Sequence, residues 1–304
     1  MAAARYVLVD VFAEGPFKGN PLAVFPDGAQ VPEGLRQTVA RELNLSETTY
    51  VLPAADDTHD FKVRIFTPAE ELPFAGHPTL GTAYVLGKLG RFSLTAGKGA
   101  TRLGEKVGPI PVRLEMNGDA AFAWMDQPLP QFGAPVADRE GVAKLLSLPK
   151  EAVRDDLPIQ NISCGVPYLI VPIESLAHVR AMRPRQDLWS ADLCGSGTPN
   201  VLAFTMETER PESDVHARMF APWLGVVEDP ATGSAAGPLG SYLVRHGQVK
   251  ARADGSFAIL EEQGFEMGRP SLLHIVIESR GADIRAVRVG GQCVWIGSGE
   301  LTLP

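Results

Sequence analysis

One pattern of residues that can bind an anion and move a proton occurs twice, in residues 64–83 and again in residues 218–235. Both copies run from Arg-x-Phe-x-Pro through a polar residue followed by proline to Gly-Thr-Ala or Gly-Ser-Ala. The polar residue is His77 in the first copy and Asp229 in the second, and both side-chain types transfer protons in enzymes. A shared order of this length indicates an internal duplication, so we expect two similar halves.

The predicted start of a helix lies within each copy. Free backbone N–H groups at a helix start carry partial positive charge and bind carboxylate or phosphate. If the two halves face each other across a pseudo-twofold axis, both helix starts point into one cleft that also holds His77 and Asp229. Glu47, expected on the loop before a strand, adds a third group for proton transfer. The residues thus predict a polar, anion-binding cleft, with the two helix starts at Gly76 and Gly233.

Each of these residues also has a structural explanation. An aspartate before a proline at a helix start is commonly an N-cap, which applies to Asp229. A lone histidine such as His77 is commonly structural, and Glu47 is one acid among many. Cys164 is a possible nucleophile, but no histidine stands at a matching spacing, and a small buried thiol is the preferred interpretation.

The elements that must position these groups are mostly strands around two apolar helices. Residues 79–89 predict a helix that is apolar or small on nearly every side, with Pro78 at its first position and a place inside a curved sheet. A second helix is expected after Asp229 as N-cap, with Pro230 first. Residues 97–108 are expected to form a polar loop and the Pro-rich residues 127–135 a linker.

The fold class predicted from these elements is α+β, with two pseudo-symmetric lobes in which a curved, mostly antiparallel sheet wraps a central helix. We place the N-terminal lobe at residues 1–127 and the C-terminal lobe at 128–304, with the last strand free to return to the first lobe.

Composition narrows the function classes. The 304 residues are 45% hydrophobic and 21% charged, as in a globular protein with a core, and carry a net charge of −8. This charge argues against nucleic acid as a partner, and no apolar run is long enough to span a membrane. The N-terminus does not read as a signal peptide, and three separate cysteines favour a reducing cytoplasm. No metal motif and no cofactor motif is present.

Several motifs together resemble the phenazine-biosynthesis PhzF-like family, and they occur in order along nearly the whole chain. They are Gly19-Asn20-Pro21, Asn44-x-Ser46-Glu47-Thr48, Gly76-His77-Pro78-Thr79-x-Gly81, Asp229-Pro-Ala-Thr-Gly-Ser-Ala235, Met267-Gly268-Arg269-Pro270-Ser271 and Val289-Gly-Gly291.

The resemblance implies the diaminopimelate-epimerase-like fold, a homodimer and a cofactor-free isomerase. It identifies Glu47 as the acid/base that takes a proton from one substrate carbon and returns one elsewhere. His77 and Asp229 would orient the substrate and assist proton movement, and the amides of Gly76, Gly233 and Ser234 would hold its carboxylate. The epimerases of this fold use a cysteine pair where this chain has His77 and Asp229, so cysteine-based racemisation is not expected.

Two alternatives remain open. The first is a non-catalytic metabolite-binding or interaction protein that keeps the cleft as a sensor. The second is a cysteine racemase, which predicts that alkylation of the thiols abolishes activity.

Overall fold

The computed structural model describes residues 2–281 and 283–304, and the chain divides into two compact units. The first unit runs from the N-terminus to Asp126 and also includes Gly290–Pro304, and the second comprises Gln127–Val289. No helix in the described ranges is long and apolar enough to cross a membrane.

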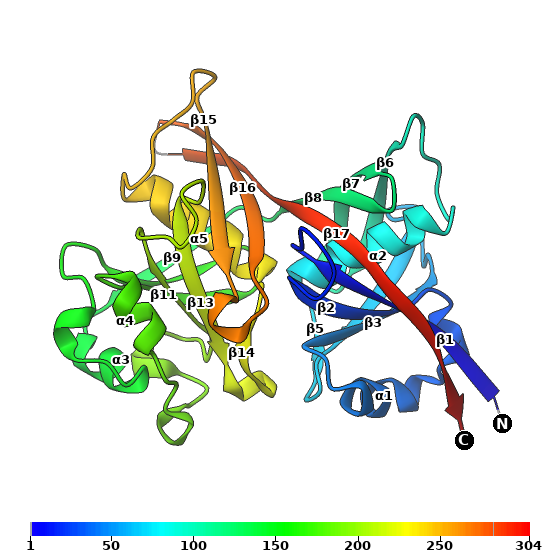
Figure 1. Ribbon diagram of the computed structural model, residues 1–304, viewed down its shortest axis with the longest axis horizontal. Coiled ribbons are helices and arrows are strands. Elements are labelled where there is room, and N and C mark those ends of the chain that lie inside the picture. The colour runs from blue at the N-terminus through cyan, green and yellow to red at the C-terminus, as the bar shows by residue number, and fades with distance from the viewer. Residues whose placement is uncertain (1, 282) are drawn as a thin grey trace. The chain divides into compact units, whose positions relative to one another are not determined.

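Strands are the main elements of the first unit (Figure 1). Its strands are β1 (Ala2–Val11), β2 (Asn20–Phe25), β3 (Glu47–Pro53), β4 (Phe61–Phe66), β5 (Glu71–Leu72), β6 (Lys98–Glu105), β7 (Gly108–Asn117), β8 (Ala120–Gln127) and the end of β17 (Asp283–Leu303). Its α-helices are α1 (Arg36–Leu43) and α2 (Gly76–Lys88).

Strand pairing in the first unit closes into a ring. β1 pairs antiparallel with β17 and β2, and β2 and β3 are parallel. β3 and β4 are antiparallel, β4 and β6 parallel, and β6, β7 and β8 follow as an antiparallel series. Because β8 also pairs with β17, the sheet returns to its first strand. A closed sheet leaves no free strand edges in the ring.

Helix α2 contacts strands β1, β2, β3, β6 and β7 of this ring, and every residue from Gly76 to Gly87 is buried. A Cβ at Gly81 would lie 2.6 Å from a methyl group of Leu22 and 2.8 Å from one of Val11, so a larger residue would require these side chains to shift. The prediction of a buried helix inside a curved sheet is confirmed. Its start is two residues earlier than Pro78, which occupies the third helical position rather than the first.

The second unit repeats this plan with its own strands and a central helix (Figure 1). Its strands are β9 (Gln131–Val136), β10 (Ile159–Ser163), β11 (Pro167–Pro172), β12 (Val201–Thr205), β13 (Val215–Ala221), β14 (Val226–Asp229), β15 (Ser256–Gln263), β16 (Ser271–Arg280) and the start of β17. Its α-helices are α3 (Arg139–Leu145), α4 (Leu176–Ala181) and α5 (Gly233–Arg245).

The pairing order of the two units matches strand by strand. In the second unit β10 and β11 are antiparallel, β11 and β12 parallel, β12 and β13 antiparallel, and β13 and β15 parallel. This is the sequence of directions seen from β1 to β6. Helix α5 contacts β10, β11, β15 and β16, as α2 contacts its own strands. The predicted α+β fold of two similar lobes is therefore confirmed.

The duplicated arginines occupy equivalent places. Arg64 donates from Nε and Nη2 to the two carboxylate oxygens of Glu71, at 2.7 and 2.8 Å. Arg218 makes the same two bonds to Glu228, again at 2.7 and 2.8 Å. Each bidentate pair joins a long strand to the short strand beside it, β4 to β5 and β13 to β14.

Two sequence expectations about local structure are wrong. Residues 97–108 are not a loop, because most of them form β6. The expected linker, residues 127–135, begins at the boundary between the two units, and its residues 131–135 belong to β9. Asp229 does not cap a helix and Pro230 does not begin one. Asp229 ends β14, and α5 begins at Gly233 after Thr232.

Candidate functional site

The first half-site joins the start of β3 to the start of α2. Helix α1 ends at Asn44, whose left-handed φ of 51° turns the chain, and Glu47 then begins β3 opposite Leu22 of the parallel strand β2. Glu47 is therefore the first residue of the strand rather than part of the preceding loop. His77, the second residue of α2, brings its Nε2 to 3.3 Å from the Glu47 Oε2.

Both side chains of this half-site are withdrawn from water. The side chain of His77 is 3% exposed and that of Glu47 is 13% exposed. Burial lowers the pKa of His77 to about 3, because the apolar surroundings disfavour the charged imidazolium. At neutral pH the contact thus joins a neutral imidazole to a carboxyl group, and the ring can either donate or accept a proton at Nε2.

The helix start adds positive potential to the same place. The N–H groups of Gly76 and His77 lie in the first turn of α2 and have no acceptor within the helix. Their partial positive charge favours a carboxylate nearby. The position of Gly76 therefore suits the binding role predicted for it, and that role stays a prediction.

The second half-site lies where β14 leads into α5. Asp229 is 4% exposed, and its Oδ2 accepts a 2.6 Å hydrogen bond from the hydroxyl of Thr232. Gln263 donates from its side-chain amide to the backbone oxygen of Asp229 at 2.6 Å and accepts from the Thr232 N–H at 3.0 Å. The aspartate is thus held by the residues that precede the helix and by the end of β15.

Gly233 and Ser234 are the first two residues of α5, so their N–H groups also lack intrahelical acceptors. The Ser234 hydroxyl lies 2.7 Å from the hydroxyl of Tyr168 on β11, and the oxygen of Gly233 accepts from the amide of Gln127 at 2.8 Å. These two contacts tie the start of α5 to Tyr168 and to Gln127.

The structure thus brings Glu47 together with His77, and Asp229 together with the start of α5. Each half-site belongs to one unit, and the shared cleft stays a prediction. Sequence reasoning assigned no role to Tyr168, Thr232 and Gln263, which support the start of α5. Thr232 stands inside the duplicated pattern, and Tyr168 follows Gly165-Val166-Pro167, which echoes Gly19-Asn20-Pro21.

The cysteines lie in surroundings that oppose thiolate chemistry. Burial raises the pKa of Cys164 to about 12 and raises the pKa of Cys293 still further. Cys194, only partly buried, also has a raised pKa. A thiolate is the reactive form of cysteine, so these thiols are poor bases and nucleophiles at neutral pH. Among residues 2–281 and 283–304, no cluster of three or more His, Cys, Asp or Glu side chains could hold a metal ion.

Comparisons with known proteins agree with this fold. The model of the family described as phenazine biosynthesis-like protein matches residues 9–299. The trans-2,3-dihydro-3-hydroxyanthranilate isomerase of Pseudomonas chlororaphis is 39% identical over 302 residues, which cover 98% of this chain and 99% of that protein.

Solved structures show the same architecture. A phenazine biosynthesis protein of the PhzF family from Bacillus anthracis superposes with a TM-score of 0.88 at 26% identity, over 100% of both chains. A hydroxyproline epimerase from Agrobacterium vitis shares the fold with a TM-score of 0.66 at 12% identity, over 99% of this chain and 91% of that one. The chain therefore belongs to the phenazine biosynthesis-like protein family and is an isomerase.

Proposed function

We propose that this protein is a cofactor-free isomerase in which Glu47 moves a proton between two carbons of a small carboxylate-bearing substrate. The single observation that carries the proposal is the 3.3 Å contact between Glu47 and His77, whose side chains are almost entirely shielded from solvent. A withdrawn carboxyl group beside a neutral imidazole forms a pair that can take up and release a proton without charging the histidine.

The reaction balances without an outside reagent. Glu47 takes a proton from one carbon, the electron pair of that C–H bond shifts through the adjacent double bond, and Glu47 returns the proton at a carbon further along. In this proposal His77, whose Nε2 lies 3.3 Å from the Glu47 Oε2, keeps the carboxyl group oriented toward the substrate. The 39% identical relative is named for the isomerisation of a dihydro-hydroxyanthranilate, and a cyclic amino carboxylate of this type is our first candidate substrate.

The remaining site residues have binding roles in this proposal. The N–H groups of Gly76, Gly233 and Ser234 hold the substrate carboxylate, since helix starts favour anions. Asp229 orients the amine or hydroxyl of the substrate, and its bond from Thr232 fixes its direction. The proposal requires that both half-sites reach the same substrate molecule.

Deuterium incorporation measured by mass spectrometry tests the proposal. Chelator-treated protein is incubated in heavy water with cyclic and amino carboxylates, including a dihydro-hydroxyanthranilate. Glu47→Gln keeps the shape of the side chain but removes the base, so exchange is expected to fall by about 10²- to 10⁴-fold. Glu42→Gln, which changes an exposed acid of α1, is the matched control and is expected to keep full exchange.

Exchange that persists in Glu47→Gln would assign the base to another residue, with His77 or Asp229 next. Tight binding of a carboxylate without any exchange would instead identify a metabolite sensor. The homodimer and the cytoplasmic location stay predictions, and light scattering of the purified protein tests the first of them.

A further inference from the structure

A buried glutamate at the end of β6 contacts the start of α2, although the proposed reaction does not use it. Glu105 is the last residue of β6 and is 8% exposed. The hydroxyl of Thr79 lies 2.5 Å from the Glu105 Oε1 and 2.5 Å from the backbone oxygen of Ala75, the residue before α2. Glu105 therefore acts on the turn that carries His77.

The single hydroxyl hydrogen of Thr79 determines which group donates in each of its two contacts. A threonine hydroxyl has one hydrogen, and a backbone oxygen can only accept. When Thr79 donates to Ala75, its oxygen must accept from Glu105, and a carboxyl group can donate only when it is protonated. Two short contacts at one hydroxyl therefore fit an uncharged Glu105.

The second unit contains a related arrangement with an amide in place of the acid, although its threonine, Thr232, stands one residue before α5 and aligns in the duplication with Leu80 rather than with Thr79. Leu103 and Gly104 of β6 pair with Phe61 and Lys62 of β4, and Glu261 and Glu262 of β15 pair with Val215 and His216 of β13. Because Arg64 and Arg218 are equivalent in the duplication, these registers place Glu105 at the position of Gln263.

Gln263 supports its helix start with permanent donors. Its amide nitrogen donates to Thr232 Oγ1 at 3.1 Å, and the Thr232 hydroxyl donates to Asp229 Oδ2 at 2.6 Å. In both units, a chain of contacts thus runs from a side chain at a strand end, through a threonine hydroxyl, to an acceptor on the segment before the helix. An amide always supplies the donor, whereas a carboxyl group does so only when it is neutral.

We propose that Glu105 is a positioning residue that works as an uncharged carboxylic acid and holds the start of α2, with His77, as Gln263 holds Asp229 and the start of α5. The consequence for catalysis rests on the proposed function, because only there do His77 and Asp229 act on substrate.

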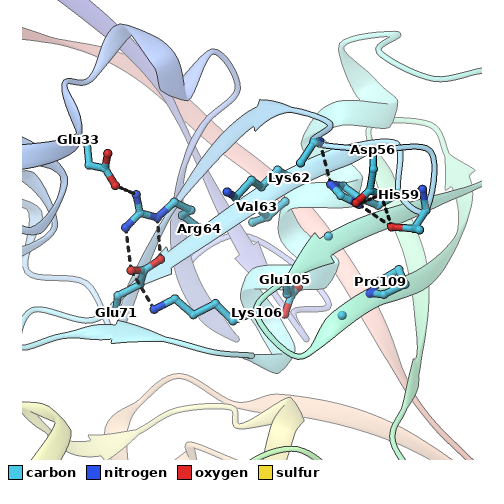
Figure 2. A pocket seen from close by; sticks show the side chains of 14 residues that line it. Glu33, Asp56, His59, Lys62, Val63, Arg64, Glu71, Glu105, Lys106 and Pro109 are labelled. Carbon is cyan, nitrogen blue, oxygen red and sulfur yellow. Dashed lines mark hydrogen bonds and ion pairs between the residues drawn. The ribbon is translucent and has the colours of Figure 1, made fainter.

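The surroundings of Glu105 support the neutral form. Burial raises its pKa to about 8, and the contacts with the Thr79 hydroxyl and with the Ala75 N–H oppose this rise without cancelling it. Glu105 also lines a pocket of about 480 Å³ (Figure 2). The titratable and charged groups that line this pocket are His59, Lys62 and Arg64 before and on β4, Glu71 on β5, the adjacent Lys106, and the exposed acids Glu33 and Asp56. Helix α2, which contacts β6, carries His77 two residues before Thr79.

These charges largely neutralise one another. Arg64 pairs with Glu33 and Glu71, Lys106 pairs with Glu71 at 2.9 Å, and His59 lies 3.3 Å from Asp56. Burial therefore stays the largest influence on Glu105.

The first test needs no substrate. The thermal midpoint of Glu105→Gln is compared with that of the unchanged protein from pH 4.5 to pH 9. A neutral acid in the folded state favours folding at low pH, and this advantage is lost as the pH rises toward 8. We expect the variant to gain stability over the unchanged protein across that range and the difference to level off above pH 8. A difference that does not change with pH would overturn the proposal.

The second test uses deuterium exchange. At pH 7, Glu105→Gln is expected to stay within about threefold of the unchanged protein, while Glu105→Leu, which cannot donate, is expected to lose at least about tenfold. Above pH 8 the unchanged protein is expected to lose about tenfold per pH unit, and Glu105→Gln is expected to lack this loss. Equal alkaline loss in both proteins, or a large loss in Glu105→Gln at pH 7, would contradict the proposal.

The reciprocal change separates this proposal from the proposed function. Gln263→Glu places an ionisable group where the amide stands and is expected to lower the thermal midpoint progressively as the pH rises, by the same physical cause. If no substrate gives exchange, the two stability profiles still decide whether Glu105 is neutral. A pH-independent Gln263→Glu profile would count against the equivalence of the two positions.

Discussion

His77 Nε2 lies 3.3 Å from Glu47 Oε2, although the rest of β3, β4 and β5 lie between the two residues in the sequence. The pair is formed because parallel pairing of β2 with β3 sets the start of β3, and α2 begins inside the same ring of strands. Because the imidazole next to the carboxyl group is neutral, we expect the stability of the protein and its turnover to depend on pH.

The low pKa of His77 predicts a loss of stability in acid. The pKa is lowered from 6.5 to about 3, so between these values the unfolded chain binds a proton that the folded protein does not. Stability from this residue is complete above pH 6.5 and falls by about 1.4 kcal/mol per pH unit below it. Urea unfolding from pH 4 to pH 8 measures the slope. His77→Asn is expected to flatten it, and an unchanged slope would place the proton uptake elsewhere.

Ser234 offers a test of carboxylate binding at the start of α5. Ser234→Ala removes a hydroxyl 2.7 Å from that of Tyr168 at the proposed binding position. Because the variant keeps the backbone N–H that is proposed to hold the carboxylate and loses only a hydrogen bond between uncharged hydroxyls, we expect kcat/KM to fall by less than about 10-fold, mainly through KM. Tyr168→Phe keeps the serine hydroxyl and should lose less. A larger loss in Tyr168→Phe would assign the binding role to the tyrosine.

The equivalent arginines predict unequal losses of stability. The side chain of Arg218 is 5% exposed, and it also donates from Nη1 to the backbone oxygens of Val179 and Met182. The side chain of Arg64 is 20% exposed. Arg218→Met leaves the partly buried carboxylate of Glu228 and two carbonyl groups without their donor, at a cost of about 3 kcal/mol. Arg64→Met should cost less, and chemical denaturation of the two variants compares them directly.

Glu261 predicts a stabilising substitution. It is fully buried, neither carboxyl oxygen has a hydrogen-bond partner among the residues described, and burial raises its pKa to about 8. The equivalent position in the first unit is Leu103. Glu261→Leu is therefore expected to raise the free energy of unfolding at pH 7 by about 1–3 kcal/mol, since a buried polar group without partners is unfavourable. If denaturant unfolding instead shows that Glu261→Leu is destabilised, the carboxyl group of Glu261 stabilises the folded protein and this prediction is wrong.

The sequence predicted those elements whose buried residues are apolar. Helix α2 was predictable because nearly all its side chains are small or apolar. Strand β6 was not, because its inward side chains are Thr101, Leu103 and Glu105, only one of which is apolar. Strand β15 likewise carries the buried acids Glu261 and Glu262. Polar groups that are buried by distant contacts give no local hydrophobic pattern.

The candidate site shows the same limit. The duplicated pattern predicted which residues stand at the helix starts, since that order lies within one short stretch. It did not predict the end of β14 at Asp229, because a Pro that follows an Asp usually opens a helix. The contacts of Thr79 with Glu105 and of Thr232 with Gln263 depend on strand register, which becomes visible only in the folded chain.

Strand β17 gives the order of biosynthesis a direct influence on folding. Its residues Cys293–Leu303 pair with β1, the first strand of the chain, and β8 also pairs with β17. On the ribosome, β1 and β8 must wait with open edges while residues 127–289 are translated. Open edges pair readily with foreign strands. The first unit is thus translated first but completes its sheet last. Until then its open strand edges are the part of the nascent chain that we expect a chaperone to bind.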